Sequence, residues 1–187
     1  WSINSNWPYN WSSEIDCSQY LPFQPQNKAE LQTAVDLWVS DNETASSNYG
    51  EINTWDVSLI TDMSFLFKDK TTFNDDISNW DVSSVVNVFQ MFDVATSFNS
   101  DISNWDVSNV TNMNAMFRHA DSFNQDISNW DVSSVTDMGN MFKDASSFNQ
   151  DLSGWDVSNV LNMIQVFGST TDLSDENKCS IESAWSS

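Results

Sequence analysis

Residues 105–129 read WDVSNVTNMNAMFRHADSFNQDISN, and the pattern within this stretch decides the fold. Its opening tetrapeptide, Trp-Asp-Val-Ser, recurs every 25 residues without an insertion, at Trp55, Trp80, Trp105, Trp130 and Trp155. A phenylalanine follows each tryptophan by 12 residues, and a Phe-Asn pair follows the first four by 18. A unit this short cannot bury its own apolar face, so the copies must stack and share one core.

Each unit predicts a strand, a turn, a short helix and a loop. The apolar residues Ile102, Trp105 and Val107 suit a strand with alternating faces. The spacing from Val110 to Met113 and onward is that of a short helix. The predicted fold class is an α/β repeat solenoid that is leucine-rich-repeat-like. Parallel short strands would form one face about 4.8 Å apart, short helices the other, with helical caps at both ends.

The predicted domain organisation has four parts. Residues 1–26 are a Trp- and Asn-rich arm, and residues 27–50 are an N-terminal cap helix followed by a polar loop. Residues 51–172 are the five repeats, and residues 173–187 are a C-terminal cap helix. Repeat stacks need such caps to shield the core at each open end.

The composition excludes several classes of partner. The formal net charge is -21, because 27 Asp and Glu outnumber 6 Lys and Arg. Nucleic acids and anionic membranes are therefore unsuitable partners. No apolar run is long enough to span a bilayer, so membrane insertion is not expected. The aromatic content of 13% is far above that of an acidic disordered tail.

The aspartate after each repeat tryptophan is the sharpest candidate site. In-register stacking predicts a carboxylate ladder, in which neighbours about 5 Å apart repel by roughly 1 kcal/mol in water. Calcium could bridge the carboxylates. Hydrogen bonds from nearby Ser hydroxyls or backbone N–H groups could also offset the repulsion. The hydrogen bonds are favoured, because one carboxylate per coil lacks the dense ligand set of a calcium loop. The calcium candidates are Asp56, Asp81, Asp106, Asp131 and Asp156.

A polar ladder on the predicted strand face is the candidate binding surface. Its members are Ser78, Asn79, Asp81, Ser83, Ser103, Asn104, Asp106, Ser108, Ser128, Asn129, Asp131 and Ser133. A second aspartate column precedes each strand, at Asp76, Asp101, Asp126 and Asp151. Short polar side chains that bond nearby backbone explain this second column without a ligand.

Nothing in the sequence indicates an enzyme. His119 is the only histidine, and no Ser-His-Asp, Cys-His or Gly-rich phosphate motif is present. The Trp, Phe and Met columns have the phase of core residues, rather than of an exposed sugar-binding stripe. No cofactor is expected, with calcium as the single alternative, and zinc has no support.

The two cysteines and three glycosylation triplets bear on location. Cys17 and Cys179 are disulfide candidates, and three arrangements are open: a bond between neighbouring copies, an intramolecular bond, or free thiols. The triplets begin at Asn10, Asn42 and Asn109 and support secretion only weakly.

The repeat unit resembles the BspA-type leucine-rich repeat. It resembles more closely a repeat domain of unassigned function in surface proteins of mycoplasmas, other bacteria and marine algae. The matching motifs are Trp-Asp-Val-Ser-x-Val-Thr-x-Met-x-x-Met-Phe and Phe-Asn-x-Asp-Ile-Ser, and the segment from Glu30 to Ile52 also matches. The resemblance covers residues 28–185. It implies a solenoid fold and a surface or extracellular location, but no reaction and no catalytic residues.

The resemblance also suggests how copies are arranged. In that family the C-terminal cap helix tends to continue into a Trp- and Asn-rich tail similar to residues 1–20. Our hypothesis is a module from a tandem array, or copies that associate head to tail into a filament. The alternative is a single molecule whose N-terminal arm packs on its own cap.

Three functions are compatible with these features. The leading one is a non-enzymatic, extracellular structural or adhesive module that contacts protein or glycan. The second is a calcium-dependent recognition module that uses the Asp column. Ice or crystal binding ranks last, because it usually requires a regular column of exposed Thr residues. Here Val86 and Leu161 interrupt the column of Thr61, Thr111 and Thr136.

Overall fold

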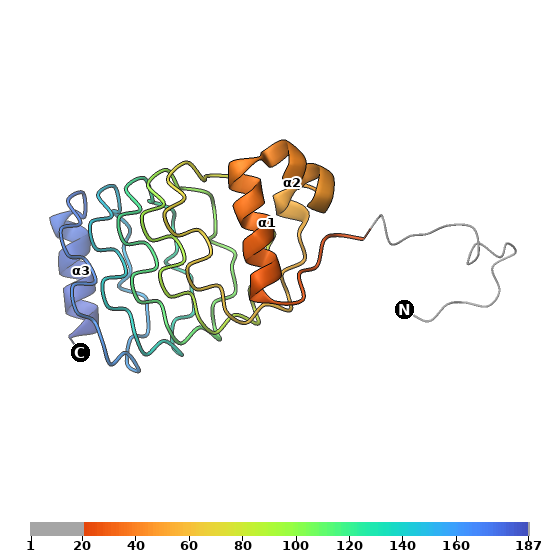
Figure 1. Cartoon of the computed structure of the whole chain (residues 1–187). Coiled ribbons are helices and arrows are strands. Elements are labelled where there is room, and N and C mark those ends of the chain that lie inside the picture. The colour runs from red at the N-terminus through yellow and green to blue at the C-terminus, as the bar shows by residue number, and fades with distance from the viewer. Residues whose placement is uncertain (1–20, 187) are drawn as a thin grey trace, which may run out of the picture.

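The computed structural model describes residues 21–186 and shows a row of stacked coils between two helical ends (Figure 1). At the N-terminal end lie helix α1 (Lys28–Ser40), helix α2 (Asn42–Tyr49) and the short 3-10 helix η3 (Ile52–Thr54). Helix α3 (Asp175–Trp185) lies at the other end. The repeats form the coils in between, and each coil lies directly against the next (Figure 1).

The predicted α/β solenoid with a parallel strand face is wrong. From Trp55 to Ser174 the described chain contains neither a helix nor a sheet, and its only β-type pairing is isolated parallel bridges between coils. The segment predicted as a strand is a pair of turns, closed by Trp105 N–H to Ile102 C=O at 3.1 Å and Val110 N–H to Val107 C=O at 2.9 Å. The hydrogen bond of each turn joins residues three apart. The apolar residues of this segment have that same spacing, so it fits two consecutive turns as well as a strand.

The segment predicted as a helix instead carries the hydrogen bonds between coils. The N–H groups of Met63, Phe65, Phe67 and Asp69 donate to carbonyls of the following coil at 2.8–3.0 Å. The same four bonds recur at all three later junctions. We call this segment, residues 62–70 with its copies 87–95, 112–120, 137–145 and 162–170, the amide ladder.

The hydrogen bonds of the amide ladder run in one direction along the stack, which is why the ladder is not a β-sheet. The four repeated inter-coil N–H groups of each copy point toward the following coil, whereas a β-strand alternates donors and acceptors along each edge. Left-handed residues make this geometry possible, with φ near +60° at two positions in every coil. These residues are Phe65, Asp69, Gln90, Val94, Ala115, His119, Asn140, Asp144, Gln165 and Ser169.

The Trp, Phe and Met columns form one core, as predicted from their phase. Phe92 stacks on Phe117 with ring centroids 5.6 Å apart, and Trp130 stacks on Trp155 at 6.5 Å. The repeat tryptophans are at most 5% exposed. Each also hydrogen-bonds backbone, as when Trp105 Nε1 donates to Ile77 C=O at 3.2 Å.

The N-terminal end is closed by α1. Asn27 caps the helix by accepting from Glu30 N–H at 3.0 Å, and Leu31, Ala34, Val35 and Trp38 are buried against the first coil. The polar loop expected at residues 40–49 is wrong, since α2 occupies it. Asp41 caps α2 by accepting from Thr44 N–H at 3.1 Å, a local signal for a helix start.

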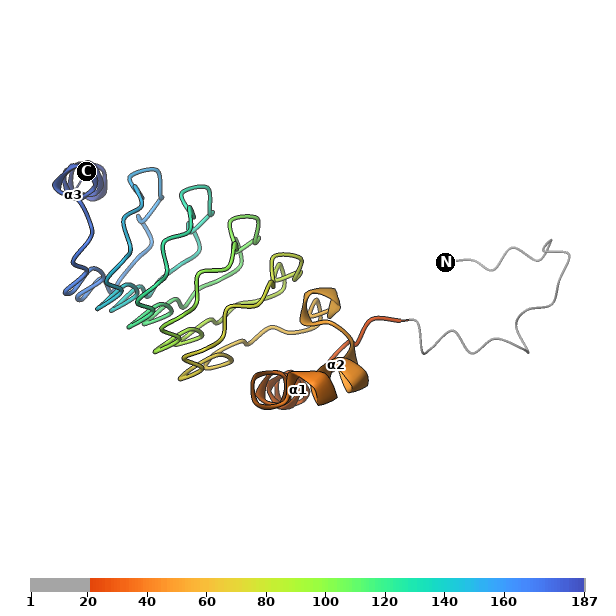
Figure 2. The same ribbon diagram turned by 90° about the horizontal axis from the view of Figure 1, so that it is seen from above.

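Helix α3 begins where a sixth coil would continue. Ser174 N–H donates to Asn149 Oδ1 at 2.9 Å. Within the repeats the equivalent bond runs from Asn99 N–H to Asn74 Oδ1 of the preceding coil. Trp185 Nε1 donates to Leu152 C=O at 3.2 Å, in the manner of a repeat tryptophan. Figure 2 shows α3 and α1 at opposite edges of the stack, so each helix covers a different half of its terminal coil. No helix within residues 21–186 is long and apolar enough to cross a membrane.

Candidate functional site

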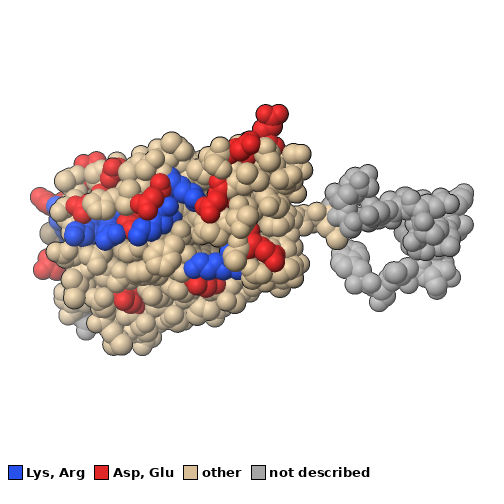
Figure 3. All heavy atoms as spheres, viewed as in Figure 1, with Lys and Arg blue, Asp and Glu red and all other residues tan. Residues whose placement is uncertain are grey.

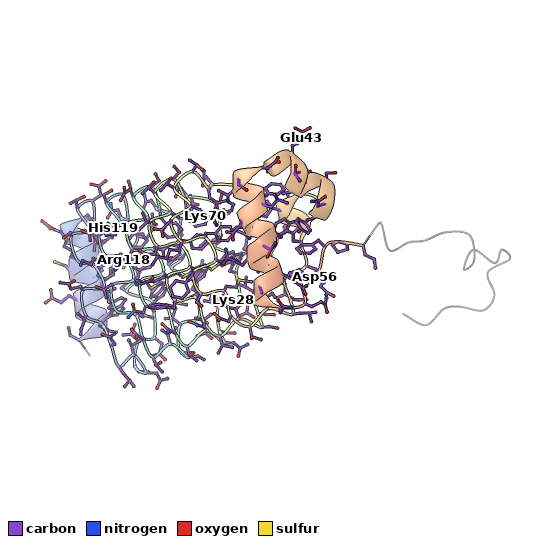
Figure 4. The ribbon with its side chains drawn as sticks, in the orientation of Figure 1. Lys28, Glu43, Asp56, Lys70, Arg118 and His119 are labelled. Carbon is purple, nitrogen blue, oxygen red and sulfur yellow. The ribbon has the colours of Figure 1, made fainter. Side chains whose placement is uncertain are left out.

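Each coil presents two faces of different charge. We call residues 72–86, 97–111, 122–136 and 147–161 the turn face. It contains nine aspartates and no lysine or arginine. Four of the six cations of the chain, Lys68, Lys70, Arg118 and Lys143, belong to the amide ladder. Figure 3 shows cations gathered in bands on the face in view, and Figure 4 places Lys70 and Arg118 on the coils and Lys28 on α1.

The repeat aspartates of the turn face are held by the serine two residues later. Asp106 Oδ1 accepts from Ser108 Oγ at 2.6 Å and from Ser108 N–H at 3.1 Å. The same two bonds form at Asp56, Asp81 and Asp131. The serine hydroxyl is the main cause that lowers the pKa of Asp106, while repulsion from Asp131 opposes it. These hydrogen bonds therefore offset the repulsion along the carboxylate column.

The second aspartate column closes a similar turn. The Oδ1 atoms accept from a serine N–H two residues later at 2.9–3.0 Å; the residues are Asp76, Asp101, Asp126 and Asp151. The serine hydroxyl is again the main cause that lowers the pKa of Asp76, Asp101 and Asp126. The neighbouring asparagines join the coils, since Asn124 N–H donates to Asn99 Oδ1 at 2.9 Å. The hydrogen bonds of this column therefore fix the turn that precedes each repeat tryptophan.

The predicted polar binding ladder lies on this turn face, although not on a strand. Its Asn and Asp residues are exposed, and its serines are half-buried against the turns. The exposed members are Asn79, Asp81, Asn104, Asp106, Asn129 and Asp131. That they bind a partner stays a prediction.

Calcium and ice were the alternative ligands of the repeat. Within residues 21–186 no group of three or more His, Cys, Asp or Glu side chains is placed to hold a metal ion. The Thr hydroxyls bond the preceding coil, as Thr111 Oγ1 does to Val86 C=O at 3.2 Å and Thr136 Oγ1 to Thr111 C=O at 3.1 Å. Their protons therefore point along the stack rather than toward an ice surface.

The structure also contains a buried ion cluster that the sequence analysis missed. Asp93 has no exposed surface and accepts from Arg118 Nε at 2.8 Å and Nη2 at 2.7 Å, with Lys68 Nζ 3.5 Å away. Hydrogen bonding to Asp93 is the main cause that raises the pKa of Arg118. A signal was present, since Asp93 is the one acidic residue in a column that also holds Lys68, Arg118, Lys143 and Gly168.

The remaining predicted residues are spread over the chain. Cys17 and Asn10 lie outside the described residues. Cys179 is an exposed, unpaired thiol on α3 within the described part of the chain. Asn42 is exposed at the start of α2, and Asn109 Nδ2 donates to Ser83 C=O at 2.9 Å. His119 Nε2 lies 3.6 Å from Asp144 Oδ2 of the following coil.

Comparison with known proteins finds one family. Residues 36–130 and residues 101–185 each match the family described as Mycoplasma protein of unknown function, DUF285. The two matches overlap within the repeats and together span the stack. No curated protein and no solved structure matches the chain.

Proposed function

This chain belongs to the DUF285 family of unknown function, and we propose that it is a non-enzymatic structural or adhesive module of the cell surface. The acidic turn face would contact a partner, and the amide ladder would hold the coils in register. The leucine-rich-repeat-type role and the extracellular location implied by the sequence resemblance are parts of this proposal.

The charge of the turn face carries the proposal. Its nine aspartates have no lysine or arginine among them, whereas the described cations lie on the amide ladder, α1 and α3. A surface with one sign of charge attracts and orients a partner of the opposite sign. A basic protein surface is therefore the partner that this face fits best.

Two further observations support a binding role over catalysis or sugar stacking. The repeat tryptophans are buried, so the turn face has no aromatic platform for a sugar ring. A general acid needs a raised carboxyl pKa. The carboxyl groups of the turn face with shifted pKa values are all shifted downward, and their hydrogen bonds to serine are the main cause.

Binding to poly-L-lysine, measured at several salt concentrations, tests the proposal. The triple variant Asp81→Asn, Asp106→Asn and Asp131→Asn should bind at least several-fold more weakly. The control has the same net charge but is changed elsewhere, at exposed Glu43→Gln, Asp172→Asn and Glu176→Gln. Equal losses in the two triple variants would show that net charge, rather than the turn face, determines binding.

Calcium-dependent recognition is the second candidate. The Oδ2 atoms of Asp81, Asp106 and Asp131 accept no hydrogen bond from the described residues, so they are available to a cation. If calcium bridges these carboxylates, millimolar calcium should raise the unfolding temperature, and a chelator should reverse the gain. The triple Asn variant should lose that response.

A further inference from the structure

Helix α3 leaves part of the last coil uncovered. At the opposite end, α1 covers the amide ladder of the first coil, where Gln32 Nε2 donates to Leu66 C=O at 3.0 Å. Helix α3 instead covers the tryptophan half of the last coil. The N–H groups of Met163, Gln165, Phe167 and Ser169 have no following coil and donate to no described residue. A row of four backbone donors therefore ends the ladder.

Apolar side chains surround this row of donors. Leu161 is 89% exposed and Ile164 is 70% exposed, the two highest values among the large apolar residues of the repeats. A hollow of about 440 Å³ lies between the coil and α3, lined by Met163, Phe167 and Trp185 among others. Apolar surface of this kind beside unpaired backbone donors is typical of an interaction edge.

An uncharged stretch of the same coil is the next feature of this edge. Residues 157–171 contain no charged side chain, whereas the equivalent residues of every other coil contain at least one. Leu161 stands where three other coils have threonine, and Ile164 stands where others have Ser64, Asn114 or Gly139. In a chain of net charge -21, an uncharged surface is where a second copy can approach with least repulsion.

The last coil presents only backbone donors in its ladder, and this restricts what can dock there. Two last coils cannot pair with each other, because both present donors. The first coil of another copy is covered by α1. A matching segment must offer backbone carbonyls and uncharged apolar side chains, and residues 1–13 do so, with Trp1, Trp7 and Trp11 and no Asp, Glu, Lys or Arg.

We propose that residues 1–13 of a second copy dock on residues 160–170 of the last coil. Their carbonyls accept from the four N–H groups, and their aromatic rings fill the hollow against α3. The chain enters the fold beside α1, at the end opposite α3 (Figure 1), so the contact joins copies head to tail. Such a contact propagates unless it closes into a ring. It does not depend on what the turn face binds.

Sedimentation velocity over a range of concentrations tests this contact. The wild-type chain should form dimers and longer species as its concentration rises. The edge variant Leu161→Thr with Ile164→Asn should associate roughly a hundred-fold more weakly, because two exposed apolar side chains are lost. Both new residues occur at these positions in other coils, so the fold should be kept. The control, Leu59→Ser with Val86→Thr, removes two exposed apolar residues from other coils and should associate like the wild type.

Mixing two variants gives a sharper result. The edge variant keeps its N-terminal segment, and a Trp7→Ser, Trp11→Ser variant keeps its edge. Each alone should remain a monomer, and an equimolar mixture should form dimers but nothing longer. A wild-type chain that stays monomeric, or a mixture without dimers, would overturn the proposal. Docking within one copy would give a different result. The wild-type chain would be a monomer, and its tryptophan fluorescence would change in the edge variant but not in the Leu59→Ser, Val86→Thr control.

Discussion

The two halves of each coil hold the stack together by different means. In the amide ladder the backbone bonds one coil to the next. One ladder position can therefore hold different residue types in successive coils, namely Ser64, Phe89, Asn114, Gly139 and Ile164. In the turn face, bonds from Trp Nε1 and to Asn Oδ1 join neighbouring coils, beside a backbone bond such as Thr111 N–H to Val86 C=O at 2.9 Å. The Asp Oδ1 atoms close turns within one coil. The turn residues therefore repeat with little change, whereas the ladder residues vary.

The largest effect should come from the turn half. Trp105→Ala removes a buried ring and its bond to Ile77 C=O, and should lower the free energy of unfolding by about 3–5 kcal/mol. Urea unfolding measures this change. Trp105→Phe keeps much of the ring and should lose clearly less. A loss below about 1 kcal/mol for Trp105→Ala would contradict the role of this column.

Loss of the buried Asp93–Arg118 ion pair, a side-chain bond between coils in the ladder half, should have the next largest effect on stability. Arg118→Ala leaves the Asp93 carboxylate buried with only Lys68 nearby, and should lower the free energy of unfolding by about 2–4 kcal/mol. Adding Asp93→Ala should recover part of that loss, since the unpaired charge is then gone. If the double variant is no more stable than Arg118→Ala, the pair is not coupled.

Acid should weaken the turn half. The pKa values of Asp56, Asp106 and Asp131 are lowered below the ordinary 3.8 by their bonds to serine. A lowered folded-state pKa stabilises the fold above the unfolded value, and that stability is lost as the pH falls through the folded value. The unfolding temperature should therefore hold to about pH 4 and fall below it. The drop should be smaller when Asp106 and Asp131 are replaced by asparagine, and an unchanged drop would disprove this cause.

The smallest effect should be a gain in the ladder half. Val94 has φ of 62°, a left-handed conformation that a β-branched residue disfavours. Val94→Gly should raise the free energy of unfolding by up to about 1 kcal/mol, net of the lost methyl groups. Thermal unfolding can compare it with Val86→Gly, which lacks a left-handed φ and should destabilise. Equal destabilisation by both would show that the left-handed position stores no strain.

Sequence reasoning succeeded where a side chain has one role in every coil. The buried columns and a helix at the N-terminal end follow from spacing and residue type alone. It failed for the secondary structure of the repeat, because Val110-x-x-Met113 suits both a helical turn and consecutive turns. It also missed the Asp93 cluster, which depends on Lys68 and Arg118 coming from the two neighbouring coils.

The sequence by itself determined the 25-residue period, the buried columns and the rows of aspartate, because equal spacing places equal residues in equal surroundings. Only the tertiary structure decided that alternate backbone amides of the ladder donate to the following coil, and that α3 covers the tryptophan side of the last coil. The physical reason is that both depend on bonds between residues about 25 positions or more apart. No local pattern specifies which of the competing conformations those bonds select.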